Sequence, residues 1–236
     1  MLTIRRSEDR GKVELDWLSS RHTFSFGSYH DSEYMGFRAL RVINEDRIAP
    51  ATGFGPHSHQ NMEILSYVIE GSLAHRDSLG NGSVIRPGDV QRMSAGTGVQ
   101  HSEQNPSENK EVRLLQIWIM PDHCDVAPSY DERRFEPEER AGRLCIVASQ
   151  HGREGSVSLD ADVSLYAGLF APGDRAELDP GPYRHVWVQV VSGEVDVEVA
   201  GGITRLHSGD GAAISDESRV GLETIKESEV LVFDLA

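Results

Sequence analysis

The sequence has only two cysteines, no excess of basic residues and no long apolar run. Cys124 and Cys145 allow at most one bridge, so a disulfide framework is excluded. Reduced thiols in a cytosolic protein are the plainer expectation. Helical periodicity is scarce as well, which argues against a helical bundle.

The chain has 23 Lys and Arg residues against 38 Asp and Glu, a formal net charge of −15 at pH 7. This balance argues against binding to nucleic acid or to an anionic membrane, because both require a basic face, and it leaves a protein partner open. No segment approaches the ~18 apolar residues of a membrane span. The N-terminus turns charged at Arg5 without the apolar region of a signal peptide. We expect a cytoplasmic protein.

Short apolar runs with strand-like alternation are present along the whole chain. Glycine and proline turns separate them, as at Leu79-Gly80-Asn81-Gly82, and this spacing predicts an all-β sandwich or barrel. Residues 121–143 differ, because they combine charged clusters with Pro121, Pro128 and Pro137. We interpret this stretch as a surface linker between an N-terminal domain, residues 1–130, and a C-terminal domain, residues 131–236.

A weak internal repeat supports the two domains. The run Leu65–Gly71 is similar to Trp187–Gly193, and a Gly-Asp turn follows each run after a comparable interval. When the two runs are aligned, the positions of three histidines of the first half fall on Asp179, Gly181 and Leu222. The second half is therefore predicted to repeat the fold without metal ligands.

Those three histidines form the most informative pattern. His57 and His59 are spaced i, i+2, and so are His101 and Glu103. Alternate side chains of a strand point to one face, so two such pairs on neighbouring strands could bring four ligand atoms to one point. Imidazoles with a carboxylate suit a first-row transition metal better than calcium or magnesium. A structural zinc site is a poor fit without a nearby cysteine.

Two alternatives remain at this level. Isolated histidines are more often surface or satisfied core residues than ligands, and the chain has ten of them. Glu63 shares the strand parity of His57 and His59, so spacing alone does not decide whether Glu63 or Glu103 supplies the carboxylate.

The order of these motifs resembles the cupin superfamily, in which two histidine-containing motifs flank a Pro-Gly-Asp turn, here residues 87–89. Further segments resemble the pirin family, and within it the bacterial pirin-like quercetin 2,3-dioxygenases. These segments are Arg21–Phe26, Met35–Phe37, Leu40–Asn44, Met93–Gly98 and Gln116–Pro121. The resemblance implies a bicupin, two stacked β-barrels of which the N-terminal one holds metal.

The resemblance also implies a ligand set and an activity. The ligands would be His57, His59, His101 and Glu103, with Glu63 and Asn105 in supporting positions around them. The cofactor would be one divalent transition metal, iron first, with Cu, Ni, Mn, Co and Zn open. The expected activity is cleavage of a flavonol such as quercetin with O2, with Glu103 also acting as general base. The alternative is an iron-binding, redox-responsive regulatory protein that acts through a protein partner.

Overall fold

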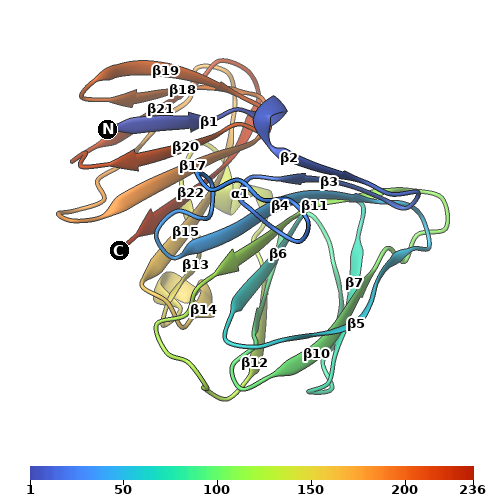
Figure 1. Cartoon of the computed structure of the whole chain (residues 1–236). Coiled ribbons are helices and arrows are strands. Elements are labelled where there is room, and N and C mark those ends of the chain that lie inside the picture. Colours follow the sequence, from blue (N-terminus) through green and yellow to red (C-terminus); the bar gives the residue numbers. More distant parts are fainter.

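The computed structural model describes residues 1–236 and shows two all-β domains, each built from a seven-stranded and a four-stranded sheet (Figure 1). The large N-terminal sheet has the order β12-β9-β6-β11-β4-β3-β2. Its strands are β2 (Gly11–Glu14), β3 (Leu18–His22), β4 (Leu40–Ile48), β6 (Glu63–Glu70), β9 (Asp89–Ser94), β11 (Val112–Ile119) and β12 (Ser129–Arg134). The small sheet, β5-β10-β7-β8, consists of β5 (Gly53–His59), β7 (Leu73–Asp77), β8 (Gly82–Ile85) and β10 (Val99–Gln104).

The C-terminal domain repeats this plan, with the large sheet in the order β1-β20-β17-β22-β15-β13-β14. Its strands are β1 (Leu2–Arg5), β13 (Cys145–Gln150), β14 (Val157–Leu159), β15 (Val163–Phe170), β17 (His185–Ser192), β20 (Gly211–Ser215) and β22 (Ser228–Leu235). The small sheet contains β16 (Arg175–Leu178), β18 (Glu194–Val199), β19 (Gly202–His207) and β21 (Val220–Thr224). Helix is limited to η1 (Ser7–Asp9), α1 (Pro137–Arg140) and η2 (Arg153–Gly155). The predicted all-β bicupin is confirmed, and none of the helices has the length and apolarity that a membrane span requires.

The expected boundary between residues 130 and 131 does not separate the two sheets completely, because a strand near each end of the first segment pairs differently from the expectation. β1 pairs with β20, so the first strand belongs to the C-terminal sheet. β12 pairs with β9, so residues 129–134 complete the N-terminal sheet instead of forming a linker. Phe135, which follows β12, is fully buried. The sequence pattern did not predict β12, because this edge strand carries polar and charged side chains, as exposed edges commonly do.

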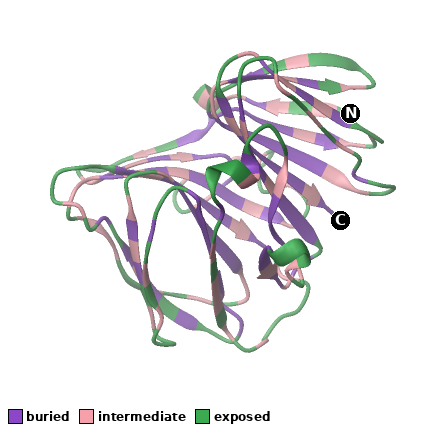
Figure 2. Ribbon diagram, turned by 180° about the vertical axis from the view of Figure 1, so that it is seen from behind, coloured by how far each residue is buried: buried purple, intermediate pink, exposed green.

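The largest apolar cluster lies between the two large sheets. It joins Leu65 and Ile117 of the N-terminal domain to Trp187 and Phe233 of the C-terminal domain. Figure 2 shows the strands at this junction mostly in the colour of buried residues. Burial of apolar surface is the main favourable term in folding, so this cluster fixes the two domains against each other.

The interiors of the two domains differ. The C-terminal interior contains one apolar cluster of 13 buried residues, and it includes Leu222, the counterpart of His101 in the repeat. The N-terminal interior contains two smaller clusters, of seven and four buried residues. The polar site described below lies in this less completely filled domain.

Candidate metal centre

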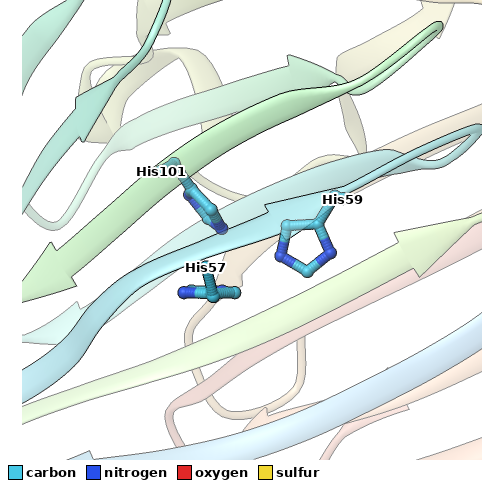
Figure 3. Close-up of side chains that lie close together, drawn as sticks. All are labelled: His57, His59 and His101. Atoms are coloured by element: carbon cyan, nitrogen blue, oxygen red, sulfur yellow. The ribbon is translucent and has the colours of Figure 1, made fainter.

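Three histidines converge in the N-terminal domain (Figure 3). β5 and β10 are antiparallel neighbours, and His101 pairs directly with His57 while Val99 pairs with His59. The ring centroids are 4.4 Å apart for His57 and His101, and 4.8 Å apart for each of the other two pairs. The expectation that the two i, i+2 pairs lie on neighbouring strands is therefore confirmed for these three residues.

A β-bulge separates His101 from Glu103 in the pairing with β5. His101 pairs with His57, but Glu103 pairs with Phe54, so β5 has one residue more than β10 in this interval. The extra residue falls at Gly55-Pro56, where proline cannot donate a ladder hydrogen bond. A Cβ at Gly53 would lie 2.3 Å from the carbonyl oxygen of Glu103, so this glycine permits the close approach of the two strands.

The imidazoles present free lone pairs. His57 Nδ1 lies 2.8 Å from the carbonyl oxygen of Gly55, which makes Nδ1 the donor and leaves Nε2 as the nitrogen available to a ligand. His101 Nε2 is buried and has no hydrogen-bond partner. Burial, together with the facing imidazoles, lowers the pKa of His59 to about 4 and that of His101 to about 3. Neutral rings with an orphaned buried nitrogen fit a divalent transition metal.

Glu103 lies beside this cluster. Its buried carboxylate accepts hydrogen bonds from Ser66 Oγ at 2.9 Å and from Gln116 Nε2 at 2.7 Å. One of its oxygens lies within 4.8 Å of a ring nitrogen of His101 and of a ring nitrogen of His75, and it does not join the group of His57, His59 and His101. The structure thus brings three of the four predicted ligands together and holds the fourth next to one of them.

The structure places Glu63 and Asn105 in contact with groups other than the three histidines. Glu63 begins β6 in the opposite sheet, where its carboxylate faces Arg92 at 3.8 Å and the Asp160 amide at 3.3 Å. The chain turns at residues 60–62, so strand parity does not carry over from His59. Asn105 donates to the carbonyl oxygens at residues 48, 49 and 110 and so fastens the loop after β10.

His75 is the residue that the sequence analysis missed. It is buried on β7, directly opposite Glu103. Its Nδ1 lies 3.5 Å from His101 Nδ1, and its Nε2 lies 3.5 Å from Asp77 Oδ2, somewhat longer than typical hydrogen bonds. His75-x-Asp77 has the same i, i+2 spacing as the predicted pairs, and this signal could have identified it. The arrangement places a second imidazole and a carboxylate in line behind His101, which suits them to orient its ring.

We expect His75→Ala to weaken metal binding by about 10- to 100-fold, the usual effect of losing a group that orients a ligand. His75→Asn should lose less, because an amide can still hydrogen-bond to the ring of His101. Competition with a chelating dye measures the affinity, and His185→Ala, in the other domain, is the control. Unchanged affinity in His75→Ala would contradict the orienting role.

An aromatic cavity of about 570 Å³ opens beside the histidines. Trp17, Phe26, Phe54 and Trp118 supply its apolar surface, and His57, His59 and Glu103 also line it. Trp118 meets His59 and Phe26 edge to face, with centroids 4.8 and 5.2 Å apart. Clefts of this size, apolar with a few polar groups, are typical small-molecule sites.

Asp46 lines the same cavity, and its titration gives a further prediction. Burial raises the pKa of Asp46 to about 7, the Ser20 hydrogen bond opposes this rise, and the carboxylates of Glu103 and Glu45 add to it. A raised pKa means that the folded state binds the proton more tightly. The stability that the bound proton contributes is complete below about pH 4 and is lost progressively as the pH rises from about 4 through about 7.

Metal-free wild-type protein should therefore lose stability relative to Asp46→Asn between about pH 4 and pH 7, because asparagine keeps the neutral shape at every pH. Metal-free protein is used because a bound cation would favour the charged carboxylate. Thermal unfolding of both proteins across this range provides the measurement, and parallel pH profiles would be the contrary result.

Two stacked domains of this topology, with one histidine cluster suited to a divalent metal, define a bicupin. The chain belongs to the pirin family. The Pirin family model matches residues 3–119, and that of the quercetinase C-terminal cupin domain matches residues 146–235.

Similar proteins support this assignment over the full length. The quercetin 2,3-dioxygenase of Escherichia coli K12 is 43% identical over 235 residues, which cover 100% of this chain and 99% of the relative. The crystal structure of YhhW from E. coli is 42% identical, with a TM-score of 0.95, and covers 100% of this chain and 98% of its own. A second structure, the bacterial pirin YhhW of E. coli in complex with nickel(II), is 42% identical with a TM-score of 0.93, over 100% of this chain and 99% of that one.

Proposed function

We propose that this protein is a metal-dependent dioxygenase that cleaves a flavonol such as quercetin with O2. The observation that carries this proposal is the aromatic cavity of about 570 Å³, which has His57, His59 and Glu103 on its surface. Its aromatic side chains suit a planar substrate of fused and linked rings. The relative named quercetin 2,3-dioxygenase adds support through its 43% identity.

His57, His59 and His101 would hold the metal, with Glu103 as a fourth ligand. His57 would bind through Nε2, because its Nδ1 is engaged by the carbonyl oxygen of Gly55. His101 would also use Nε2, its orphaned nitrogen, while its Nδ1 faces His75. When bound, a divalent metal supplies Lewis acidity that favours ionisation of a substrate hydroxyl. We propose iron as this metal, and the nickel(II) complex of the E. coli pirin makes nickel the first comparison.

The protein's own groups would position the substrate and move its proton. Trp118 and Phe26 would pack against the substrate rings and exclude water from the reacting face. Glu103 would accept the hydroxyl proton as general base, since Ser66 and Gln116 fix its carboxylate in one orientation. Such positioned proton transfer is typically worth ~10²–10⁴-fold in rate.

The test is oxygen uptake by purified protein of measured metal content, with quercetin as substrate. Loading separately with iron, nickel, copper, manganese, cobalt and zinc identifies the active metal. We expect flavonol-dependent O2 consumption in proportion to bound metal, and none in metal-free protein. If fully loaded protein consumes no O2 with flavonols under any of these metals, the dioxygenase proposal is wrong and the iron-dependent regulatory function becomes the better hypothesis.

A further inference from the structure

A second pocket, lined only by polar residues, lies where the two domains meet. It has a volume of about 340 Å³ and shares no residue with the aromatic cavity. Four arginines line it together with one carboxylate and three serines. The serines come from both domains. Ser7 lies in η1, just before the N-terminal sheet, and Ser19 lies on β3 of that sheet, whereas Ser208 follows β19 of the C-terminal domain.

The arginines are Arg10, Arg21, Arg47 and Arg113. Arg113 on β11 pairs directly with Arg47 on β4, an arrangement of like charges that disfavours strand pairing. The chain as a whole carries a formal charge of −15, so a gathering of four cations in one pocket is not a consequence of composition. An anion in the pocket would reduce this repulsion.

The carboxylates present do not balance this charge inside the pocket. Glu45 is the only acidic residue that lines it, and it pairs with both Arg10 and Arg113, each at 2.8 Å. Arg113 also faces the exposed Glu70, which does not line the pocket, at 3.5 Å. Arg10 and Arg113 outweigh the effect of burial and lower the pKa of Glu45. Arg21 and Arg47 pair outside the pocket with Glu14 and Glu111, whose side chains are 57% and 47% exposed. Exposed pairs of this kind are weak and easily exchanged.

Arg10 holds one of these charges in a fixed position at the pocket. Its side chain is 2% exposed, and its Nη1 has no hydrogen-bond partner. Nη2 donates to Ser7 Oγ and to Glu45, so the guanidinium is fixed in place with one nitrogen unsatisfied. Buried donors, and charged ones above all, are normally paired, because leaving them unpaired is costly.

We propose that this pocket binds a small tetrahedral oxyanion of the phosphate class. The planar guanidinium of arginine matches phosphate oxygens in bidentate geometry, and serine hydroxyls complete such sites. The strongly negative net charge disfavours a polyanion such as nucleic acid, which leaves a small anion as the ligand. An ion contacting Arg47 and Ser208 together would bridge the two domains. The proposal is independent of the metal and of the dioxygenase activity.

Calorimetric titration of the full-length, metal-containing protein with inorganic phosphate, at constant ionic strength with chloride as the reference anion, tests the proposal. We expect one saturable site in the wild type. Arg21→Gln and Arg47→Gln should each weaken it by about tenfold or more, the usual loss when a charge-assisted hydrogen bond is removed. These variants leave the ion pairs of Glu45 with Arg10 and Arg113 intact. Arg175→Gln, which removes an exposed arginine paired with Glu223, is the matched control and should bind as the wild type does.

Two further measurements separate this site from the metal. His57→Ala should bind phosphate as the wild type does, and phosphate should raise the unfolding temperature of wild type but not of Arg47→Gln, because a ligand of the native state stabilises it. A phosphate monoester such as glycerol phosphate, titrated in parallel, shows whether the site takes the free ion or a phosphorylated small molecule. The absence of saturable binding to wild type at about 10 mM phosphate would overturn the proposal. So would phosphate binding that is lost in His57→Ala and retained in Arg47→Gln.

Discussion

His57→Ala is expected to lose tight metal binding altogether. The three imidazole rings face one another at centroid distances of 4.4 to 4.8 Å, and removing one leaves only two of these three nitrogen donors beside Glu103. Loss of an orienting group typically costs ~10–100-fold in affinity, so loss of a direct ligand should exceed about 100-fold. Metal analysis after dialysis should fall from about one equivalent per chain toward zero.

The half-buried position of His57 makes this the cleanest ligand variant, because truncation leaves the apolar core untouched. His101→Ala should give the same loss, with an added cost in stability because His101 is buried. His207→Ala, at an exposed histidine of the C-terminal domain, is the control. If His57→Ala retains stoichiometric metal after dialysis, the ion is held elsewhere and the proposed centre is wrong.

Glu103→Gln should separate metal binding from chemistry. Glutamine has nearly the same shape, and it fits the existing contacts because the Ser66 hydroxyl can accept as well as donate while Gln116 still donates to the amide oxygen. Three imidazoles still hold a divalent metal, although more weakly. Glutamine cannot accept the substrate proton, so turnover per bound metal should fall by about 10²-fold or more.

The comparison requires reloading with excess metal and expressing the rate per bound ion. Glu63→Gln is the matched control, since Glu63 is equally buried in the same domain but contacts Arg92 and the Asp160 amide instead of the histidines. Its rate per metal should remain near wild type. A Glu103→Gln variant that turns over at the wild-type rate per metal would show that Glu103 is not the base.

The two domains differ in the side chains that fill their interiors. The C-terminal interior is closed by apolar side chains that include Leu222, at the position of His101 in the repeat. The N-terminal interior contains polar groups and the aromatic cavity, and its apolar residues form only two smaller clusters. The buried histidines lie in the N-terminal domain alone, which explains why a duplicated fold presents one candidate centre.

Some features followed from the sequence because their physical basis is local. The two-residue period of a strand places His57 and His59 on one face, and the same period applies to His101 and Glu103. Short strands between glycine turns indicated an all-β fold, and the similarity of Leu65–Gly71 to Trp187–Gly193 indicated two copies of it. Each of these inferences depends on neighbours in the chain.

Other features required the tertiary structure, because long-range pairing and register are not encoded in local spacing. Residues 2–5 pair with a strand more than two hundred residues away, which no local pattern indicates. The turn before β6, with Asn61 at φ 50°, interrupts the strand parity that Glu63 shares with His57 and His59 in the sequence. The pairing of β7 with β10 brought His75 to His101, and the folding of six separate segments assembled the walls of the aromatic cavity. Strand periodicity thus determined which side chains share a face, and sheet pairing decided which faces meet.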